Sequence, residues 1–347
     1  MKFPKGIEGD YLETNEGLIF DIKGLLHPND RKICFIRFYP DQNGDRTRNN
    51  LKYKKIYDLE ERYTFLRKNF PEYLFYSKQN DLELQGVEIS KIKNIYTPRS
   101  HLKKLQSNKK LSKIDTQSIE LCNLLIKEGN LNFYNIGITG STMVGLNKKT
   151  SDIDLVLYGT EISHKFQNNL QRLFSSKKDN FRKYNKSEFK KHYKFRASGS
   201  GIGFNEFLRS EKMKLHQGKF KNTDFYIRYL KSPEDWKGTY NDFIYENLGR
   251  ISLKAKIINS KDSIFTPSTY KINVLKLYPS QNSFKNSKLN EITEINSYRG
   301  RFCEHAEKND LVFVEGKLEK VNFKDSETYY RVLLGNKPND KMIKLIN

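Results

Sequence analysis

Two short apolar segments, joined by a glycine–serine step and a polar loop, constrain this chain more than any other feature. Residues 133–139 and 152–158 are rich in β-branched and aromatic side chains, which predicts two strands. Apolar residues recur on one side of residues 115–127, which predicts a helix ahead of them. A further helix is expected after Ser163, a residue type that caps helices. Strands that alternate with helices in this way predict a mixed sheet covered by helices.

The second apolar segment begins with two carboxylates, Asp152 and Asp154. Successive residues of a strand point to opposite faces, so both side chains are expected on the same face. Two carboxylates held this close repel each other unless a cation lies between them, and oxygen ligands on a rigid edge suit Mg²⁺. The sequence therefore predicts a magnesium site at this strand. The simpler interpretation is a solvated pair of aspartates at a strand edge.

The glycine–serine step is a candidate phosphate-binding element. Gly140 allows close approach of the backbone, and Ser141 is expected to begin a short helical turn whose free N–H groups attract phosphate. One turn then offers phosphate ligands and the next strand offers metal ligands. Nucleotidyl transfer requires this pairing, because metal ions bridge the triphosphate, activate the attacking hydroxyl and stabilise the leaving pyrophosphate. An ordinary turn serine is the alternative interpretation of Ser141.

These residues carry a resemblance to a known family. Gly140-Ser141, ten further positions and Asp152-x-Asp154 between apolar strands resemble the nucleotidyltransferase superfamily typified by DNA polymerase beta. The match covers residues 115–231, about a third of the chain. The resemblance implies that the Gly-Ser step binds a nucleoside triphosphate (NTP), with Ser151 beside it, and that the two aspartates bind two Mg²⁺ ions. The chain also looks like archaeal proteins in which extra domains flank this core.

The family takes a third carboxylate from a later strand. Asp224, in the apolar segment 223–230, is the best match, and Glu206 in a predicted helix is a weaker one. The resemblance implies that Asp224 helps to bind one metal ion and acts as, or orients, the base for the acceptor hydroxyl. Arg228 lies four residues further along the same strand face and is a candidate contact to the triphosphate. An ordinary turn acid and a sheet-surface arginine are the respective alternatives.

Further segments are expected around this core. Residues 1–97 combine short apolar runs, turns and one helix capped by Asp58, which predicts a small α+β domain. Residues 98–114 hold six Lys or Arg and no acid, and are expected to form a basic linker. Residues 246–347 contain short alternating segments, which predicts a β-rich, barrel-like domain. The nucleotidyltransferase core then spans residues 115–245, and the fold class of the whole chain is α+β.

A surplus of positive charge, 63 Lys and Arg against 41 Asp and Glu, attracts polyanions. Residues 177–221 hold fourteen basic and four acidic residues, with aromatic residues interleaved. Cations beside stacking platforms suit single-stranded RNA or DNA. The alternative is a solvated helix face whose aromatic residues point into the core. The predicted nucleic-acid contacts are Lys183, Lys190, Lys191, Lys194 and Arg196.

Other features bear on the compartment and the partners. No segment approaches the roughly 18 apolar residues that a membrane helix needs, so a membrane is not expected as a partner. The three cysteines are too scattered for a disulfide framework, and no apolar segment suggesting a secretory signal follows Met1. We therefore expect reduced thiols and a cytoplasmic protein, and the sequence leaves the oligomeric state open.

The expected function is Mg²⁺-dependent transfer of a nucleoside monophosphate from an NTP to a nucleic-acid 3′ end, with release of pyrophosphate. Two alternatives stay open. The first is the same transfer to a hydroxyl of a protein or a small molecule, which needs no basic surface. The second is a nucleic-acid-binding module without catalysis, against which the presence of Asp152, Asp154 and Asp224 argues.

Overall fold

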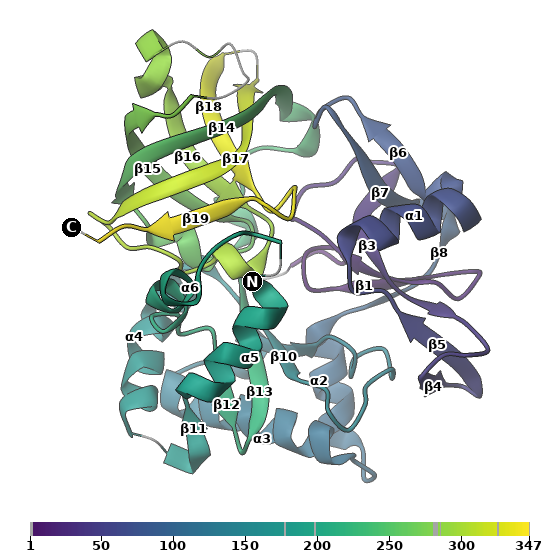
Figure 1. Ribbon diagram of the computed structural model, residues 1–347. Helices are drawn as coiled ribbons and strands as arrows, with labels where there is room; N and C mark the ends of the chain where they lie inside the picture. The colour runs from purple at the N-terminus through teal and green to yellow at the C-terminus, as the bar shows by residue number, and fades with distance from the viewer. Residues whose placement is uncertain are drawn as a thin grey trace. The chain divides into compact units, whose positions relative to one another are not determined.

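A computed structural model describes residues 3–176, 178–197, 199–279, 284, 286–324 and 326–346. Within these residues the chain is α+β, and its strands form three sheets (Figure 1). The chain divides into two compact units. The first unit comprises residues 1–78, 82–182 and 217–240, and the second comprises residues 79–81, 183–216 and 241–347.

The N-terminal part of the first unit is an eight-stranded sheet with one covering helix, as the mixed composition of residues 1–97 predicts. The strand order is β4-β5-β3-β2-β1-β8, with β7 paired to β3 and β6 paired to β7. Leu66 of helix α1 (Leu59–Asn69) packs into the buried face of this sheet. The strands are β1 (Tyr11–Thr14), β2 (Ile19–Ile22), β3 (Arg31–Pro40), β4 (Arg46–Arg48), β5 (Leu51–Lys55), β6 (Leu74–Ser77), β7 (Leu82–Glu88) and β8 (Ile92–Tyr96).

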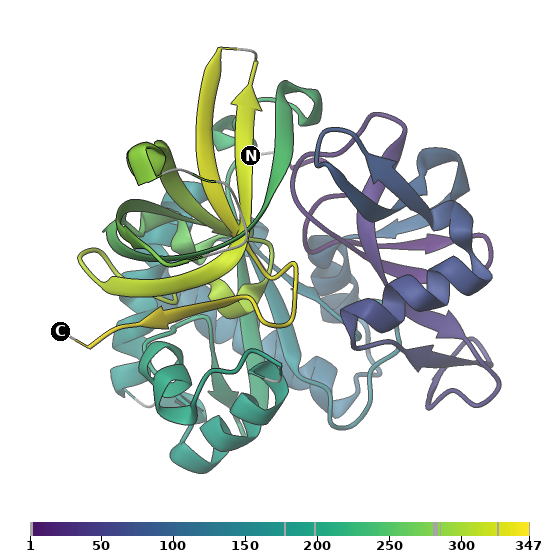
Figure 2. The same ribbon diagram turned by 45° about the horizontal axis from the view of Figure 1, so that its top comes forward.

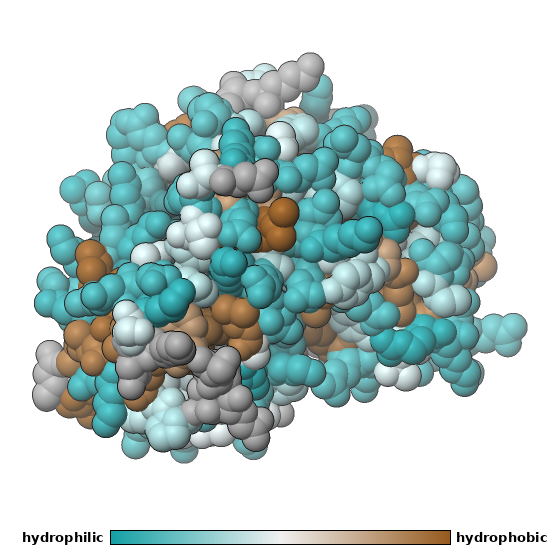
Figure 3. Space-filling view, turned by 90° about the horizontal axis from the view of Figure 1, so that it is seen from above, coloured by the Kyte–Doolittle hydropathy of each residue, from teal (hydrophilic) through white to brown (hydrophobic). Residues whose placement is uncertain are grey.

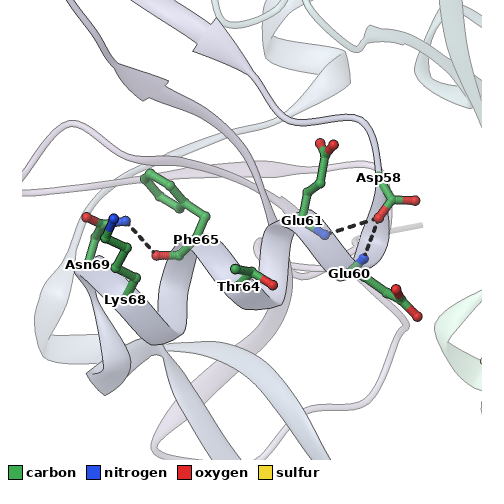
Figure 4. Close-up of a pocket in the computed structure, with 7 residues that line it drawn as sticks. All are labelled: Asp58, Glu60, Glu61, Thr64, Phe65, Lys68 and Asn69. Atoms are coloured by element: carbon green, nitrogen blue, oxygen red, sulfur yellow. Dashed lines mark hydrogen bonds between the residues drawn. The ribbon is translucent and has the colours of Figure 1, made fainter.

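Helix α1 begins and ends where the sequence predicts. The Asp58 carboxylate accepts hydrogen bonds from the backbone N–H groups of Glu60 and Glu61, and the helix ends at Phe70, because Pro71 follows. A surface hollow runs along this helix (Figure 4). None of the predicted site residues lines it.

A five-stranded mixed sheet forms the rest of the first unit, in the order β11-β12-β13-β10-β9. Strand β10 runs parallel to β13, and the other neighbours are antiparallel. Helices α3 and α4 pack against β10. The elements are α3 (Lys113–Gly129), β9 (Ile136–Thr139), β10 (Ile153–Tyr158), α4 (Thr160–Ser176), β11 (Phe181–Arg182), β12 (Gln217–Phe220) and β13 (Thr223–Leu230).

The stretch expected as a basic linker contains a helix, α2 (Pro98–Ser107). Leu102 and Leu105, three residues apart on one helix face, are buried. The helix packs on β9, where Gly137 leaves room for it, because a Cβ there would lie 2.6 Å from the backbone of Pro98. Residues 98–107 therefore belong to the packed first unit, and their lysines cover its surface.

The second unit contains a closed barrel of five strands, which confirms the barrel-like expectation (Figures 1 and 2). The ring runs β14-β15-β16-β18-β17 and closes by pairing of β17 with β14. Only β16 and β18 are parallel among these neighbours, and this connectivity is that of an OB-fold. The strands are β14 (Phe243–Asn259), β15 (Ser268–Leu277), β16 (Ile292–Ser297), β17 (Leu311–Phe323) and β18 (Glu327–Leu334), with β19 (Lys341–Lys344) added beside β17.

Two helices join the barrel in the second unit, α5 (Lys186–Arg196) and α6 (Phe204–Glu211). Residues 183–216, expected inside the nucleotidyltransferase core, therefore cluster with the barrel. Buried ion pairs hold this region together: Lys214 binds Glu211, and its Nζ donates to the Arg301 carbonyl at 2.6 Å. Across the described residues no helix is long and apolar enough to cross a membrane. The three cysteines are buried thiols.

Candidate functional site

The structure brings the Gly140 backbone against the Asp154 carboxylate. Gly140 has a φ of +76°, and a Cβ at this position would lie 2.3 Å from Oδ2 of Asp154. Only glycine tolerates both the positive φ and the missing space. Because Thr139 pairs with Asp154 across β9 and β10, the sheet register fixes this approach.

The two serines of the motif also meet. The Ser141 hydroxyl lies 3.3 Å from that of Ser151, which in turn accepts a hydrogen bond of 2.9 Å from the Lys148 backbone N–H. Residues 141–145 form hydrogen-bonded turns rather than the short helical turn expected from the sequence. The amide of Leu146 closes this segment by donating to the Ser141 carbonyl.

The Asp152 and Asp154 carboxylates are not held by direct contacts to other side chains of the described residues. Asp152 is exposed and Asp154 is half-buried, and among the described residues neither side chain has a hydrogen bond or an ion pair. Desolvation of the Asp154 carboxyl, followed by repulsion from Asp152, raises the pKa of Asp154 well above its ordinary value.

Asp224 lies next to this pair in register but is engaged elsewhere. The parallel pairing of Ile153 with Phe225 places the preceding residues side by side, Asp152 just before β10 and Asp224 in β13. The Asp224 carboxylate forms an ion pair of 3.0 Å with Lys219 of β12 and is about half exposed. The described part of the chain contains no group of three or more His, Cys, Asp or Glu residues placed to hold a metal ion. The role of Asp224 as third ligand stays a prediction, as does the weaker alternative, Glu206.

The N-terminal sheet contributes charges around Asp154 that sequence reasoning missed. Lys55 of β5 and Arg37 of β3 oppose the rise in the pKa of Asp154, whereas Asp21 of β2 adds to it. Arg37 also hydrogen-bonds to the buried Tyr11. These residues lie about a hundred positions ahead of the motif in strands without a recognisable signature, so only the tertiary fold could identify them.

Arg228 is engaged by the N-terminal segment. Its guanidinium forms an ion pair with the fully buried Glu8, whose other oxygen accepts a hydrogen bond from the Gly24 amide. Lys23 lies 3.3 Å from the same Glu8 carboxylate. Arg228 therefore helps to attach the N-terminal segment to β13 in this structure, and a contact to a triphosphate stays a prediction.

The predicted nucleic-acid contacts divide into two groups. Lys190, Lys191 and Lys194 of α5 are exposed. Lys183 donates hydrogen bonds to backbone carbonyls of residues 213 and 214, and Arg196 is half-buried beside Glu211. Lys177, at the start of the basic stretch, lies outside the described residues. The exposed lysines are thus the part of this set that is available to a polyanion.

The aromatic residues of the same stretch mostly point inward. Phe181 and Phe189 are buried, and Tyr184 packs edge-on against Phe189. Phe195 differs, with 73% of its surface exposed beside Lys194. The alternative interpretation of this stretch, aromatic residues in the core, is therefore right for the buried members, and Phe195 is exposed to solvent.

The barrel carries a second basic surface, which the sequence did not single out. Lys254 of β14 lies directly opposite Lys276 of β15 and opposite Phe313 of β17. The Lys276 ammonium lies 5.1 Å from the ring centroid of Tyr278, and that ring meets Phe313 edge-on. Like charges directly opposite on neighbouring strands are unfavourable unless an anion lies over them. The face of the molecule seen in Figure 3 is likewise mostly hydrophilic.

Comparisons with known proteins identify a relative without an assigned role. The chain is 26% identical, over 334 residues, to the "Uncharacterized protein MJ1086" of Methanocaldococcus jannaschii, and the match covers 94% of each chain. No protein-family model matches the chain. No solved structure matches it. The chain is therefore similar to an archaeal protein over nearly its whole length.

Proposed function

We propose that this protein is a nucleotidyltransferase with a polymerase-beta-type core, and that Asp152 and Asp154 bind Mg²⁺ with an NTP substrate. One observation carries the proposal: two adjacent carboxylates without a protein partner, with the backbone of a Gly-Ser turn held against one of them. Uncompensated carboxylates in crowded surroundings are costly, and a bound cation relieves that cost.

The donor set fits a divalent cation bound with its substrate. Mg²⁺ takes one or two carboxylates and completes its octahedral shell with phosphate oxygens and water. Asp152 and Asp154 supply those carboxylates, and the Ser141 and Ser151 hydroxyls lie on the adjoining turn. A bound Mg²⁺ would supply charge neutralisation for the triphosphate. Because three carboxylates do not gather among the described residues, the second ion would depend on phosphate oxygens or on release of Asp224 from Lys219.

A nucleic-acid 3′ end is the acceptor that the charges favour. Exposed lysines on α5 and the facing lysines of β14 and β15 provide phosphate contacts, and Phe195, Tyr278 and Phe313 provide ring surfaces beside them. Stacking with backbone neutralisation binds single strands without reading their sequence. Both surfaces belong to the second unit, so we assign acceptor binding to it and nucleotide binding to the first unit.

The experiment is incubation of the protein with labelled NTPs, Mg²⁺ and RNA or DNA oligonucleotides with free 3′ ends. We expect extended strands and released pyrophosphate. Asp152→Asn and Asp154→Asn should lower the rate at least about a thousandfold, because the metal contributes several kcal/mol to transition-state stabilisation. Asp235→Asn, an exposed acid of the same unit, is the matched control and should leave the rate unchanged.

The outcome also decides between acceptors. Label on the protein or on an added small hydroxyl compound would keep the transferase and replace the nucleic-acid acceptor. Binding of oligonucleotides without incorporation into any acceptor would contradict the transferase and favour a binding module. Asp224→Asn reports on the third ligand, because a loss as large as that of Asp154→Asn requires Asp224 to leave Lys219 during the reaction.

A further inference from the structure

The turn that follows Gly140-Ser141 is embedded in the N-terminal sheet. Met143, Val144 and Leu146 form one buried cluster with Phe38 of β3 and Tyr53 of β5, among other residues of that sheet. The sheet therefore fixes the position of the turn. If residues 1–97 take part in the chemistry, they do so where this sheet adjoins the carboxylates.

Arg46 joins the sheet to the loop that leads to Asp152. Its guanidinium donates a hydrogen bond to the Leu146 carbonyl and lies 5.4 Å from the centroid of the Phe38 ring. The second terminal nitrogen lies 3.4 Å from the Tyr57 hydroxyl. Only 7% of Arg46 is exposed. Next to it, Asp45 forms an ion pair with Lys148 of the same loop, so the hairpin of β4 and β5 holds this loop at two points.

A cation and an exposed ring lie together at the end of this hairpin. The Lys55 ammonium lies 4.6 Å from the centroid of the Tyr57 ring, and no carboxylate among the described residues is within ion-pair distance of it. Burial, followed by repulsion from Arg37, lowers the pKa of Lys55 to about 8, and attraction by Asp152 and Asp154 opposes this. The ammonium is therefore within electrostatic reach of both predicted metal ligands.

Tyr57 has the exposure of a ligand-binding residue rather than of a core residue. Although its hydroxyl approaches Arg46 and its ring approaches Lys55, 56% of its surface is open to solvent. A ring with one face on a cation and its edge fixed by an arginine is positioned to accept a flat partner on the free face. Nucleobases are such partners, and stacking does not depend on which base is present.

We propose that Tyr57 and Lys55 form the nucleotide-recognition wall of the site, where Tyr57 stacks on the base of the NTP and Lys55 contacts its polyphosphate. Arg46 acts as a positioning residue that ties Tyr57 to the loop ahead of Asp152. This inference rests on the proposed nucleotidyltransferase function and gives the N-terminal sheet its part in it. It also predicts that the enzyme discriminates little among bases, because no base-edge contact is involved.

The test measures binding, without turnover, of a non-hydrolysable NTP analogue with Mg²⁺ and, separately, of inorganic tripolyphosphate with Mg²⁺. Tyr57→Ala should weaken the NTP analogue about tenfold and leave tripolyphosphate unchanged, since only the analogue has a base. Tyr57→Phe keeps the ring and loses the contact to Arg46, so it should weaken the NTP analogue less than Tyr57→Ala does and leave tripolyphosphate unchanged. Lys55→Gln should weaken both probes about tenfold. Tyr134→Ala is the matched control, because Tyr134 is 76% exposed and lies beyond the opposite end of β9 from Asp154.

The two proposals fail in different ways. If the wild type binds neither probe, the proposed nucleotidyltransferase function is overturned together with this inference. If the wild type binds the analogue and Asp154→Asn abolishes binding, but Tyr57→Ala binds as tightly as the wild type, only the recognition wall is overturned. A Tyr57→Ala variant that weakens both probes equally also overturns it, because the ring would then support the structure rather than the base.

Discussion

Two clusters of charged side chains, one in each compact unit, differ in how their charges are paired. In the barrel, Glu319 is buried and lies 2.8 Å from both Arg331 and Lys317, which are buried as well. In the first unit, Asp152 and Asp154 lie side by side with no ion pair among the described residues. The barrel network pairs its carboxylate with two cations and holds strands together, whereas the two aspartates form no ion pair among the described residues. Unpaired charge in a well-packed unit therefore marks the place where function is to be sought.

The largest expected effect tests the barrel side of this comparison. Glu319→Ala leaves Arg331 and Lys317 buried without a counter-charge, so we expect the free energy of unfolding of the barrel to fall by about 3–5 kcal/mol. Chemical denaturation followed by hydrogen exchange of β17 and β18 measures it. Glu327→Ala, an exposed acid on β18, should change stability by less than about 0.5 kcal/mol. An equal effect of both variants would contradict the assigned role of the network.

Two buried groups, one in each unit, should respond to pH in opposite directions. Burial lowers the pKa of His305 in the barrel unit to about 4, below the ordinary value of about 6.5. Its contribution to stability is complete above the ordinary pKa and is lost as the pH falls toward 4. In the first unit, burial raises the pKa of Asp10 to about 7. Its contribution is complete below about pH 4 and is lost as the pH rises through 7.

Hydrogen exchange, corrected for the intrinsic exchange rate, measures each unit separately. Comparison of the wild type with His305→Gln and with Asp10→Asn isolates the two groups. We expect the contribution of His305 to fall by about 2 kcal/mol between pH 7 and pH 5, and that of Asp10 to fall by a similar amount between pH 5 and pH 8. A variant with the same pH dependence as the wild type would contradict the role given to its group.

The aspartate pair should lower the stability of the first unit when no divalent cation is present. Asp154→Asn removes a desolvated charge and its repulsion by Asp152, so without divalent cations we expect the free energy of unfolding of the first unit to rise by about 2 kcal/mol. Thermal unfolding in a chelator measures the change. Mg²⁺ should raise the melting temperature of the wild type and not that of the variant. A less stable variant would show that Asp154 has a structural role.

The smallest expected effect concerns the exposed lysines of α5. Replacing Lys190, Lys191 and Lys194 by alanine should flatten the slope of log binding constant against log salt by about 2 for a single strand, with stability unchanged. Oligonucleotide titrations at several salt concentrations measure it. A matched triple variant on the first unit, at Lys103, Lys109 and Lys110, should leave the slope as it is. Equal slopes for the two triple variants would show that binding is not localised on α5.

Local patterns predicted much of the fold. The cap at Asp58, the end of α1 before Pro71 and the bounds of β13 follow from side-chain chemistry within a few residues. The basic stretch after residue 97 was misjudged, because its charge outweighed the spacing of Leu102 and Leu105, which are buried in α2. Two apolar residues three positions apart are by themselves a weak signal of a buried helix face. The packing of both side chains is seen only in the folded unit.

The candidate site also has one part that the sequence predicted and another that it did not. Gly140 and Asp154 belong to one motif that spans fifteen positions of sequence, and two neighbouring strands bring them together. Lys55 comes from a distant strand with no motif, so its approach to the carboxylates was not predictable. Arg228 shows the converse, because its strand position was predicted and its buried partner Glu8, from the far N-terminus, was not.

The central claim is that Asp152 and Asp154 together bind a divalent cation. Titration of Mn²⁺, a paramagnetic substitute for Mg²⁺, with the non-hydrolysable NTP analogue present tests it most directly. The account predicts saturable binding to the wild type and to Asp235→Asn, and at least about tenfold weaker binding to Asp152→Asn and to Asp154→Asn. Absence of binding to the wild type, or equal binding to all four proteins, would contradict it.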